Sequence, residues 1–141
     1  MDVTSHLYLI DSSIWIRVLR ESPLSSELAD RVRTLVDGRA VAVNDLIRVE
    51  VLIGSRDEIQ FQRVERTFAA LVRFPIERGT WTSASDLGFS MRIKGVKNAP
   101  DLVIAASALE HEAVVMHADR DFDTIAAHSD LRVESYVGVD L

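Results

Sequence analysis

The chain has 141 residues and a mass of 15.7 kDa, the size of one domain with a substantial core. It has no cysteine, which excludes disulfides, thiolate metal sites and a cysteine nucleophile. The formal net charge of −6 argues against a general nucleic-acid coat protein, although acids that hold divalent cations also count as negative.

Nothing in the sequence predicts a membrane protein or a secreted one. No apolar stretch approaches the roughly 18 residues that a membrane span requires. The first residues, MDVTSH, lack the basic start and apolar body of a signal peptide. We therefore expect a cytoplasmic protein. The absence of repeats and of linkers rich in proline or glycine indicates a single domain over residues 1–141.

Short apolar runs predict the strands of a buried sheet. LYLI (7–10), AVAV (40–43) and AVVM (113–116) are mostly β-branched or otherwise apolar and read as buried strands. RVESYV (132–137) alternates polar and apolar residues, as a strand at the edge of a sheet does.

The segments between these strands have helical periodicity. Apolar residues recur at intervals of three and four, and Ser, Asn, Asp or Pro stands near several of the starts. The expected helices cover residues 25–37, 44–54, 57–72, 82–95, 100–112 and 119–128. The broad apolar face of the third consists of Ile59, Phe61, Val64, Phe68, Leu71 and Val72. Strands that alternate with helices predict an α/β sandwich around a mainly parallel sheet.

Acidic residues stand where such a fold binds its ligands, beyond the carboxyl ends of the strands. Asp11 directly follows the first strand, and Asp119 comes shortly after the strand 113–116. Asp101 lies in the first turn of a helix, where the helix dipole favours an anion, and Glu50 lies in mid-helix beside an apolar stripe. Two carboxylates about 4 Å apart repel by roughly 4 kcal/mol at an effective dielectric of 20, so a fold that gathers several of them needs a cation or shared protons.

Each acid also has an ordinary structural explanation. Asp11 is a good cap for a helix that begins near Ser13, and Asp101 suits a helix dipole. Glu50 reads as a partly solvated helix residue, and Asp119 and Asp121 as turn or cap residues. Independent caps need not gather at one edge of a sheet, so the combination favours a site for a hard cation, Mg²⁺ or Mn²⁺.

Three segments carry a family resemblance: LIDSSIWI at the start, IRVEVLIG around Glu50, and PDLVIAASALEHEAVVMHADRDFDTIA in the C-terminal part. Together, in this order, they resemble the PIN-domain ribonucleases, and specifically the VapC-type toxins of type II toxin–antitoxin pairs. The resemblance runs nearly end to end. It implies a PIN-like three-layer α/β/α sandwich and a Mg²⁺-dependent endoribonuclease that hydrolyses RNA phosphodiester bonds, with Mn²⁺ as a possible substitute.

The resemblance also implies roles for individual residues. Asp11, Glu50, Asp101 and Asp119 would be the catalytic acidic quartet around the metal. Asp121 would be a supporting acid, and Ser13 would orient Asp11 or a metal-bound water. His117 stands where many members have Thr or Ser, and its surroundings in the sequence favour a packing or rim residue over a general base. The family further implies a homodimer and a cognate antitoxin protein as partners.

Contact with the RNA substrate is expected from local basic residues. Arg92, Lys94 and Lys97 precede Asp101 and are the first candidates to meet phosphates at the rim of the site. The second candidates are Arg17, Arg20, Arg48 and Arg56; ordinary solvated helix charge explains any one of these basic residues equally well. Trp15, between two isoleucines, reads as core or interface rather than as a base-stacking residue.

Other enzyme classes fit the sequence less well. A haloacid-dehalogenase-like phosphatase needs a second Asp where this chain has Ser13, and a receiver domain needs adjacent acids at the end of its first strand. A dinucleotide or P-loop fold needs a glycine-rich turn, which DSSIW is not. The alternative that stays open is a catalytically silent PIN-like module that binds RNA or a protein partner.

Overall fold

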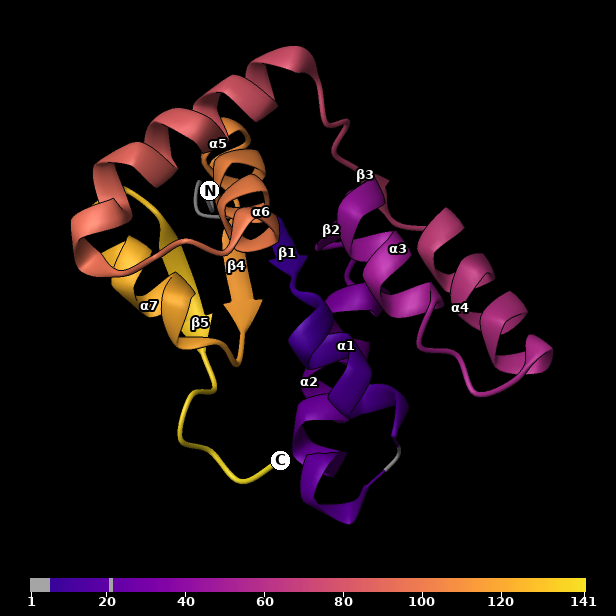
Figure 1. Cartoon of the computed structure of the whole chain (residues 1–141). Coiled ribbons are helices and arrows are strands. Elements are labelled where there is room, and N and C mark those ends of the chain that lie inside the picture. The colour runs from indigo at the N-terminus through magenta and orange to yellow at the C-terminus, as the bar shows by residue number, and fades with distance from the viewer. Residues whose placement is uncertain (1–5, 21) are drawn as a thin grey trace, which may run out of the picture.

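The computed structural model describes residues 6–20 and 22–141 (Figure 1). Residues 1–5, on which the interpretation of the N-terminal segment depends, lie outside the described residues. The elements in chain order are β1 (Tyr8–Ile10), α1 (Ser12–Leu19), η1 (Pro23–Ser25), α2 (Ser26–Asp37), β2 (Val41–Val43), α3 (Asp45–Leu52), α4 (Glu58–Ala69), β3 (Val72–Arg73), α5 (Arg78–Met91), η2 (Arg92–Lys94), α6 (Ala99–Glu110), β4 (Val114–His117), α7 (Arg120–Ala127) and β5 (Arg132–Ser135). Among the described residues, no helix combines the length and apolar character that crossing a membrane requires.

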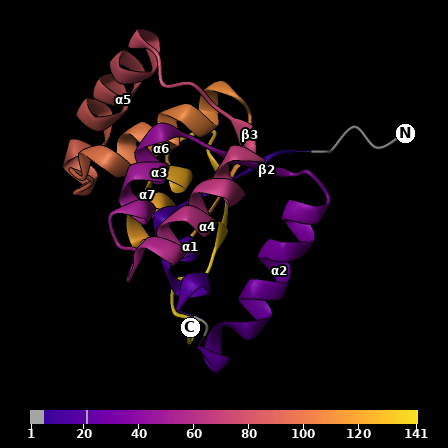
Figure 2. The ribbon, with the colours of Figure 1, turned by 90° about the vertical axis from the view of Figure 1, so that its right-hand side faces the viewer.

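The five strands form one sheet in the order β3-β2-β1-β4-β5, and every neighbouring pair is parallel. Leu9, in the middle of the sheet, pairs with Ala42 on one side and Val115 on the other. Helix α2 covers one side of the sheet, and α5, α6 and α7 lie on the other (Figure 2). The expected three-layer α/β/α sandwich is confirmed, and all carboxyl ends of the strands meet at one edge.

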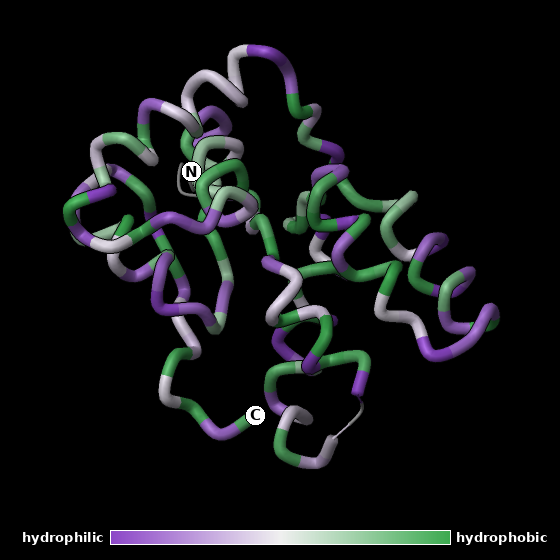
Figure 3. The backbone as a smooth tube through the Cα atoms, in the orientation of Figure 1, coloured by the Kyte–Doolittle hydropathy of each residue, from purple (hydrophilic) through white to green (hydrophobic). Residues whose placement is uncertain are grey.

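The centre of the molecule consists of the middle strands and helix α6. The side chains of Leu9, Ile10 and Val115 have no exposed surface. All eight residues from Asp101 to Ala108 are buried, because α6 is packed against α5, α7, α3 and β4 and is apolar on nearly every side. Figure 3 shows this as hydrophobic colouring along β1, β4 and α6. The Asp101 carboxylate therefore stands in the first turn of a largely apolar helix.

The bounds expected for the helix at residues 57–72 are wrong. The helix ends at Ala69, and Val72 begins β3, a strand of two exposed residues that no apolar run predicts. The broad apolar face is divided between core and surface, since Ile59 is 70% exposed and Phe61 is 38% exposed. Only Val64 and Phe68 of that face are buried, and Phe68 makes an edge-on contact with Trp15, which confirms Trp15 as a core residue.

The helix expected at 82–95 begins earlier and ends earlier. It starts at Arg78, because Glu77 and Thr80 form a reciprocal capping box in which Thr80 occupies the position usually held by Glu or Gln. It ends at Met91, and Arg92–Lys94 form a single 3₁₀ turn. Gly95 closes this turn with a φ of 87°, a left-handed conformation that glycine adopts without strain.

A polar cluster fastens α2 to the strands β1 and β5. The Arg31 guanidinium donates to both carboxylate oxygens of Glu134, at 2.9 and 3.2 Å, and to the Tyr8 hydroxyl at 3.3 Å. The Tyr136 hydroxyl donates to Glu134 at 2.6 Å. Although partial burial opposes it, hydrogen bonding by Arg31 and Tyr136 holds the pKa of Glu134 below its usual range, and burial together with the bond to Glu134 raises the pKa of Tyr136 to about 12.

We expect Glu134→Gln to lower the free energy of unfolding by about 0.5–1 kcal/mol at pH 7, because the pair is partly solvated. The Glu134 pKa is lower in the folded than in the unfolded protein, so its contribution exists above the unfolded pKa and is lost as pH falls through the folded pKa. The difference in unfolding free energy between the wild-type protein and the Glu134→Gln variant should therefore vanish in acid. Urea denaturation at pH 7 and near pH 3 measures it, and an equal difference at both values would contradict the assignment.

Candidate active site

Asp11 lies at the carboxyl end of β1, where it is both the cap of α1 and a member of the acidic site. Its backbone N–H donates to Met116 O at 2.9 Å, which prolongs the pairing of β1 with β4. Its Oδ2 accepts from the N–H and the hydroxyl of Ser13, at 3.0 and 2.6 Å. Because both hydrogen bonds go to Oδ2, the other carboxylate oxygen is left for a cation. Asp11 can therefore cap α1 and still act as a metal ligand. The contact expected between Ser13 and Asp11 is present.

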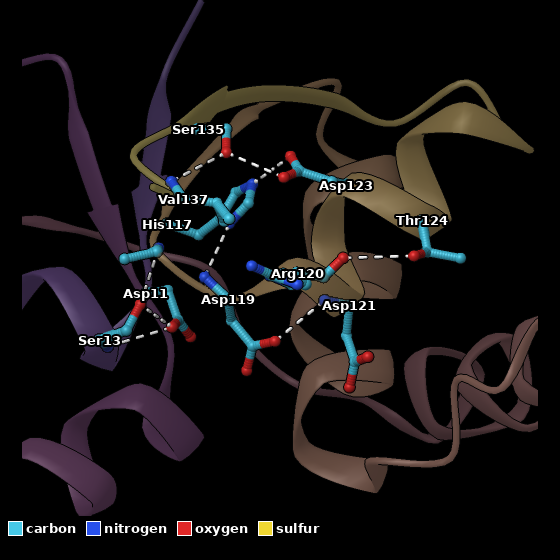
Figure 4. A network of polar contacts seen from close by, with 11 residues as sticks. Asp11, Ser13, His117, Asp119, Arg120, Asp121, Asp123, Thr124, Ser135 and Val137 are labelled. Atoms are coloured by element: carbon cyan, nitrogen blue, oxygen red, sulfur yellow. Dashed lines mark hydrogen bonds and ion pairs between the residues drawn. The ribbon is translucent and has the colours of Figure 1, made fainter. Parts of the chain in front are cut away.

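Asp101, Asp119 and Asp121 make the tightest acidic group in the described part of the chain. One carboxylate oxygen from each lies within 4.8 Å of the other two. Asp119 caps α7, its Oδ1 accepting from the N–H of Asp121 at 2.9 Å, while Asp101 stands in the first turn of α6. Figure 4 shows Asp119 between Asp11, which follows β1, and Asp121, in the first turn of α7. Asp121, expected only as a supporting acid, belongs to this group of three aspartates.

Glu50 lies on α3, close enough to Asp11 for the two carboxylates to repel each other. It is half-buried, and its Oε1 has no hydrogen-bond partner within the described residues. Burial raises its pKa, and the Asp11 carboxylate adds to the effect, while a hydrogen bond from the Ser12 hydroxyl opposes it. The sequence reasoning did not include Ser12 in the site. Asp11 raises the pKa of Asp101 and of Glu50, but in the described part of the chain neither Asp11 nor Glu50 belongs to the three-aspartate group.

Burial, with repulsion between the carboxylates added to it, raises the pKa values of the acids in the site. Burial and repulsion from Asp119 raise the pKa of Asp101 to about 8, and a hydrogen bond with the Asp119 carboxylate adds to this. Burial also raises the pKa of Asp11 and of Asp121, and Asp119 repels both. Carboxylates this close do not all ionise easily without a compensating charge, so the metal-free protein favours the protonated form of Asp101.

The donor set fits a hard divalent cation. Every candidate ligand atom is a carboxylate oxygen, which is the ligand type that Mg²⁺ and Mn²⁺ prefer. The buried Oδ2 of Asp101 and Oε1 of Glu50 have no hydrogen-bond partner in the described part of the chain. Buried oxygens of this kind are costly without a partner, and a cation would supply one.

His117 is the last residue of β4 and is fully buried, so of the two expected roles packing is confirmed and a position at the rim is wrong. Its Nδ1 accepts from the Asp119 N–H at 3.1 Å. Its Nε2 lies 3.2 Å from Asp123 Oδ1, in an electrostatic contact whose geometry falls short of a hydrogen bond. Burial lowers the pKa of His117, although Asp123 opposes the shift.

The basic residues expected at the rim lie on the segment that leads into α6. Arg92, Lys94 and Lys97 are all exposed, and in the described part of the chain none of them forms an ion pair. The Arg92 guanidinium lies 3.7 Å from the centre of the Phe89 ring, which is itself 67% exposed. Of the second candidates, Arg48 is bound to Glu65 in an ion pair.

Comparisons with known proteins agree with this geometry. The PIN domain family matches residues 8–128. Ribonuclease VapC11 of Mycobacterium tuberculosis is 30% identical over 135 residues, which cover 92% of this chain and 99% of that protein. Ribonuclease VapC51 of the same organism is 34% identical over 125 residues, 85% of each chain. The structure of VapBC2 from Rickettsia felis bound to a promoter DNA fragment has a chain that superimposes with a TM-score of 0.73 at 16% identity, over 92% of this chain and 98% of that one.

Proposed function

Because the chain belongs to the PIN domain family, among its VapC ribonucleases, we propose that it is a metal-dependent endoribonuclease and the toxin of a toxin–antitoxin pair. One observation carries the proposal: three carboxylate oxygens, from Asp101, Asp119 and Asp121, lie within 4.8 Å of one another. The preferred ion is Mg²⁺, with Mn²⁺ as a substitute, since both favour oxygen ligands.

The mechanism follows from how the acids are held. Asp101, Asp119 and Asp121 would bind the cation directly. Asp11 and Glu50 would bind it through its water molecules or as further ligands. When bound, a divalent cation stabilises charge on the phosphoryl oxygens and makes a bound water more acidic. The proton of the Asp101 carboxyl has to leave before that carboxylate can bind a cation, so binding should strengthen as pH rises.

The test is cleavage of RNA by the purified protein with and without a divalent cation. We expect cleavage with Mg²⁺ or Mn²⁺ and a loss of at least ~100-fold in excess EDTA, because the cation supplies several kcal/mol of charge stabilisation. Full activity in EDTA would overturn the proposal. RNA binding without cleavage, and without stabilisation by Mg²⁺ in a thermal melt, would instead indicate the silent binding module.

The exposed segment of Arg92, Lys94 and Lys97 is proposed to contact the phosphates of the RNA on the approach to Asp101. Exposed lysines that bind phosphates release counterions from the RNA, and this adds to the affinity whatever the base sequence of the RNA is. We expect the double variant Lys94→Gln/Lys97→Gln to raise KM for RNA with little change in kcat. The salt dependence of binding should fall by about 1.4 in log–log slope, at ~0.7 per phosphate contact for a single strand.

The matched control is Arg39→Gln. Arg39 is also exposed and basic, but it precedes β2 and therefore stands at the amino edge of the sheet, away from the acids. This variant should leave KM and the salt slope unchanged. If it weakens RNA binding as much as the lysine variant does, the effect belongs to net charge and not to this segment.

A cognate antitoxin and a homodimer are further parts of the proposal. The superimposable Rickettsia felis chain comes from a VapBC complex, and VapC11 and VapC51 match nearly all of this chain. Apolar side chains left exposed on the helices or at their ends give such partners a surface: Val49, Ile53, Ile59, Trp81 and Phe89. Light scattering of the purified chain, alone and with the protein encoded beside it, measures both associations.

A further inference from the structure

The turn between β4 and α7 carries Asp119, and side chains hold its backbone. The N–H of Ala118 donates to the Ser13 hydroxyl at 3.1 Å. The N–H of Asp119 donates to His117 Nδ1 at 3.1 Å, and the N–H of Asp121 donates to the Asp119 carboxylate at 2.9 Å. Three N–H groups between residues 118 and 121 therefore donate to side-chain acceptors.

The His117 ring is fixed by contacts on several sides. It is fully buried and packs against Phe122, with the ring centres 5.0 Å apart. Because Nδ1 accepts a hydrogen bond, the proton of the neutral ring is on Nε2, which faces Asp123 Oδ1 at 3.2 Å. The other oxygen of Asp123 accepts from the Ser135 hydroxyl at 3.0 Å. A chain of polar contacts thus runs from the end of β5 through α7 to the Asp119 backbone (Figure 4).

We propose that His117 is a positioning residue for the acidic site: its Nδ1 fixes the backbone of Asp119 and thereby aims the Asp119 carboxylate, and Asp123 holds the ring. The inference rests on the proposed function, since it assigns His117 a part in building the metal site. Asp119 makes both contacts at once: its N–H donates to His117 Nδ1, and its Oδ1 accepts from the N–H of Asp121.

Two simpler explanations fit the contacts less well. An apolar side chain at position 117 would fill the space beside Phe122, but it would leave the N–H of Asp119 without its acceptor. A general base would have to touch the substrate, and the His117 ring has no exposed surface. What distinguishes histidine here is an acceptor at Nδ1 together with an Nε2 that faces the Asp123 carboxylate.

Two substitutions separate the roles of Nδ1 and Nε2 of His117. His117→Asn keeps an acceptor near the position of Nδ1, whereas His117→Gln keeps a polar group near Nε2 and loses that acceptor. Calorimetric titration of the metal-free protein with Mn²⁺ is the main measurement. We expect the Asn variant to stay within about threefold of the wild-type Kd and the Gln variant to bind ~10-fold more weakly or worse, as for other groups that orient metal ligands.

Further measurements separate positioning from simple damage to the fold. Hydrogen exchange at the Asp119 amide should speed up in the Gln variant and not in the Asn variant, and RNA cleavage should lose kcat with KM unchanged. The double variant His117→Gln/Asp123→Ala should bind Mn²⁺ no more weakly than His117→Gln alone, because Asp123 acts through the ring. The control is His128→Gln, which alters an exposed histidine after α7 and should change nothing.

Equal loss in the Asn and Gln variants, or loss in neither, would overturn the inference. If His117→Gln does not fold, Asp123→Ala at its partly exposed position decides instead: weaker Mn²⁺ binding supports the inference, and an unchanged Kd overturns it. A wild-type protein that binds no Mn²⁺ would contradict the proposed function itself. That result is distinct from a wild-type protein that binds Mn²⁺ and is insensitive to His117.

Discussion

Asp101→Asn is expected to abolish RNA cleavage and, at the same time, to make the metal-free protein more stable. The carboxylate is buried in the first turn of α6, close to the carboxylates of Asp119 and Asp121. Removing it should cost at least ~100-fold in cleavage rate, because a ligand of the cation is lost. Removing it also removes a buried negative charge, because burial and repulsion from Asp119 raise the Asp101 pKa to about 8.

The gain in stability is the distinctive part of this prediction. Asparagine has nearly the shape of aspartate and needs no proton to be neutral, so the free energy of unfolding at pH 8 should rise by ~1–3 kcal/mol. Chemical denaturation in EDTA measures it, beside RNA cleavage in Mg²⁺. The control is Asp86→Asn on the exposed face of α5, which should alter neither. An Asp101→Asn protein that cleaves RNA normally would remove Asp101 from the site.

The second large effect is the pH dependence of the metal-free protein. Asp101 has a higher pKa in the folded than in the unfolded state, so between the ordinary value of 3.8 and about 8 the folded protein binds the extra proton. Stability must then fall as pH rises through this range, the opposite of a salt-bridged carboxylate. Asp11, Glu50 and Asp121 act in the same direction, because their pKa values are also raised.

A divalent cation should reverse this dependence. With Mg²⁺ at 100 times its Kd the protein gains about 2.7 kcal/mol, and the gain should be largest at pH 8, where the ligands lose their protons most easily. Thermal melts between pH 5 and 8.5, with EDTA and with Mg²⁺, give both curves. A metal-free protein whose melting temperature rises steadily toward pH 8 would contradict the assignment of a repulsive acidic cluster.

The sequence predicts the outer frame of the site because strand ends are easy to recognise. LYLI and AVVM are apolar enough to be strands, and the parallel order then brings Asp11 and Asp119 to one edge. The role of Asp101 follows less directly, since a first-turn acid is common in any helix. Glu50 is the weakest case, because its place in mid-helix says nothing of what it faces.

The elements that were missed have no local pattern. β3 consists of Val72 and Arg73, both exposed, and exists because it pairs with β2. The start of α5 depends on a capping box between Glu77 and Thr80, which does not match the usual Ser or Thr followed by Glu. The contact between His117 and Asp123 joins a strand to a helix across a turn, and no helical or strand period predicts it.

The two ends of the sheet determine how this chain can assemble with others. A long, flat outer strand would offer free backbone groups to a neighbouring molecule, whereas here β3 has only two residues, and Arg73 is bound to Asp45. At the opposite end, Arg132 and Glu134 place charge on β5, and the Arg132 guanidinium donates to the carbonyl of Glu112. Growth by strand addition is thereby discouraged, so lasting complexes of this protein should form through its helices, and its sheet should stay five strands wide.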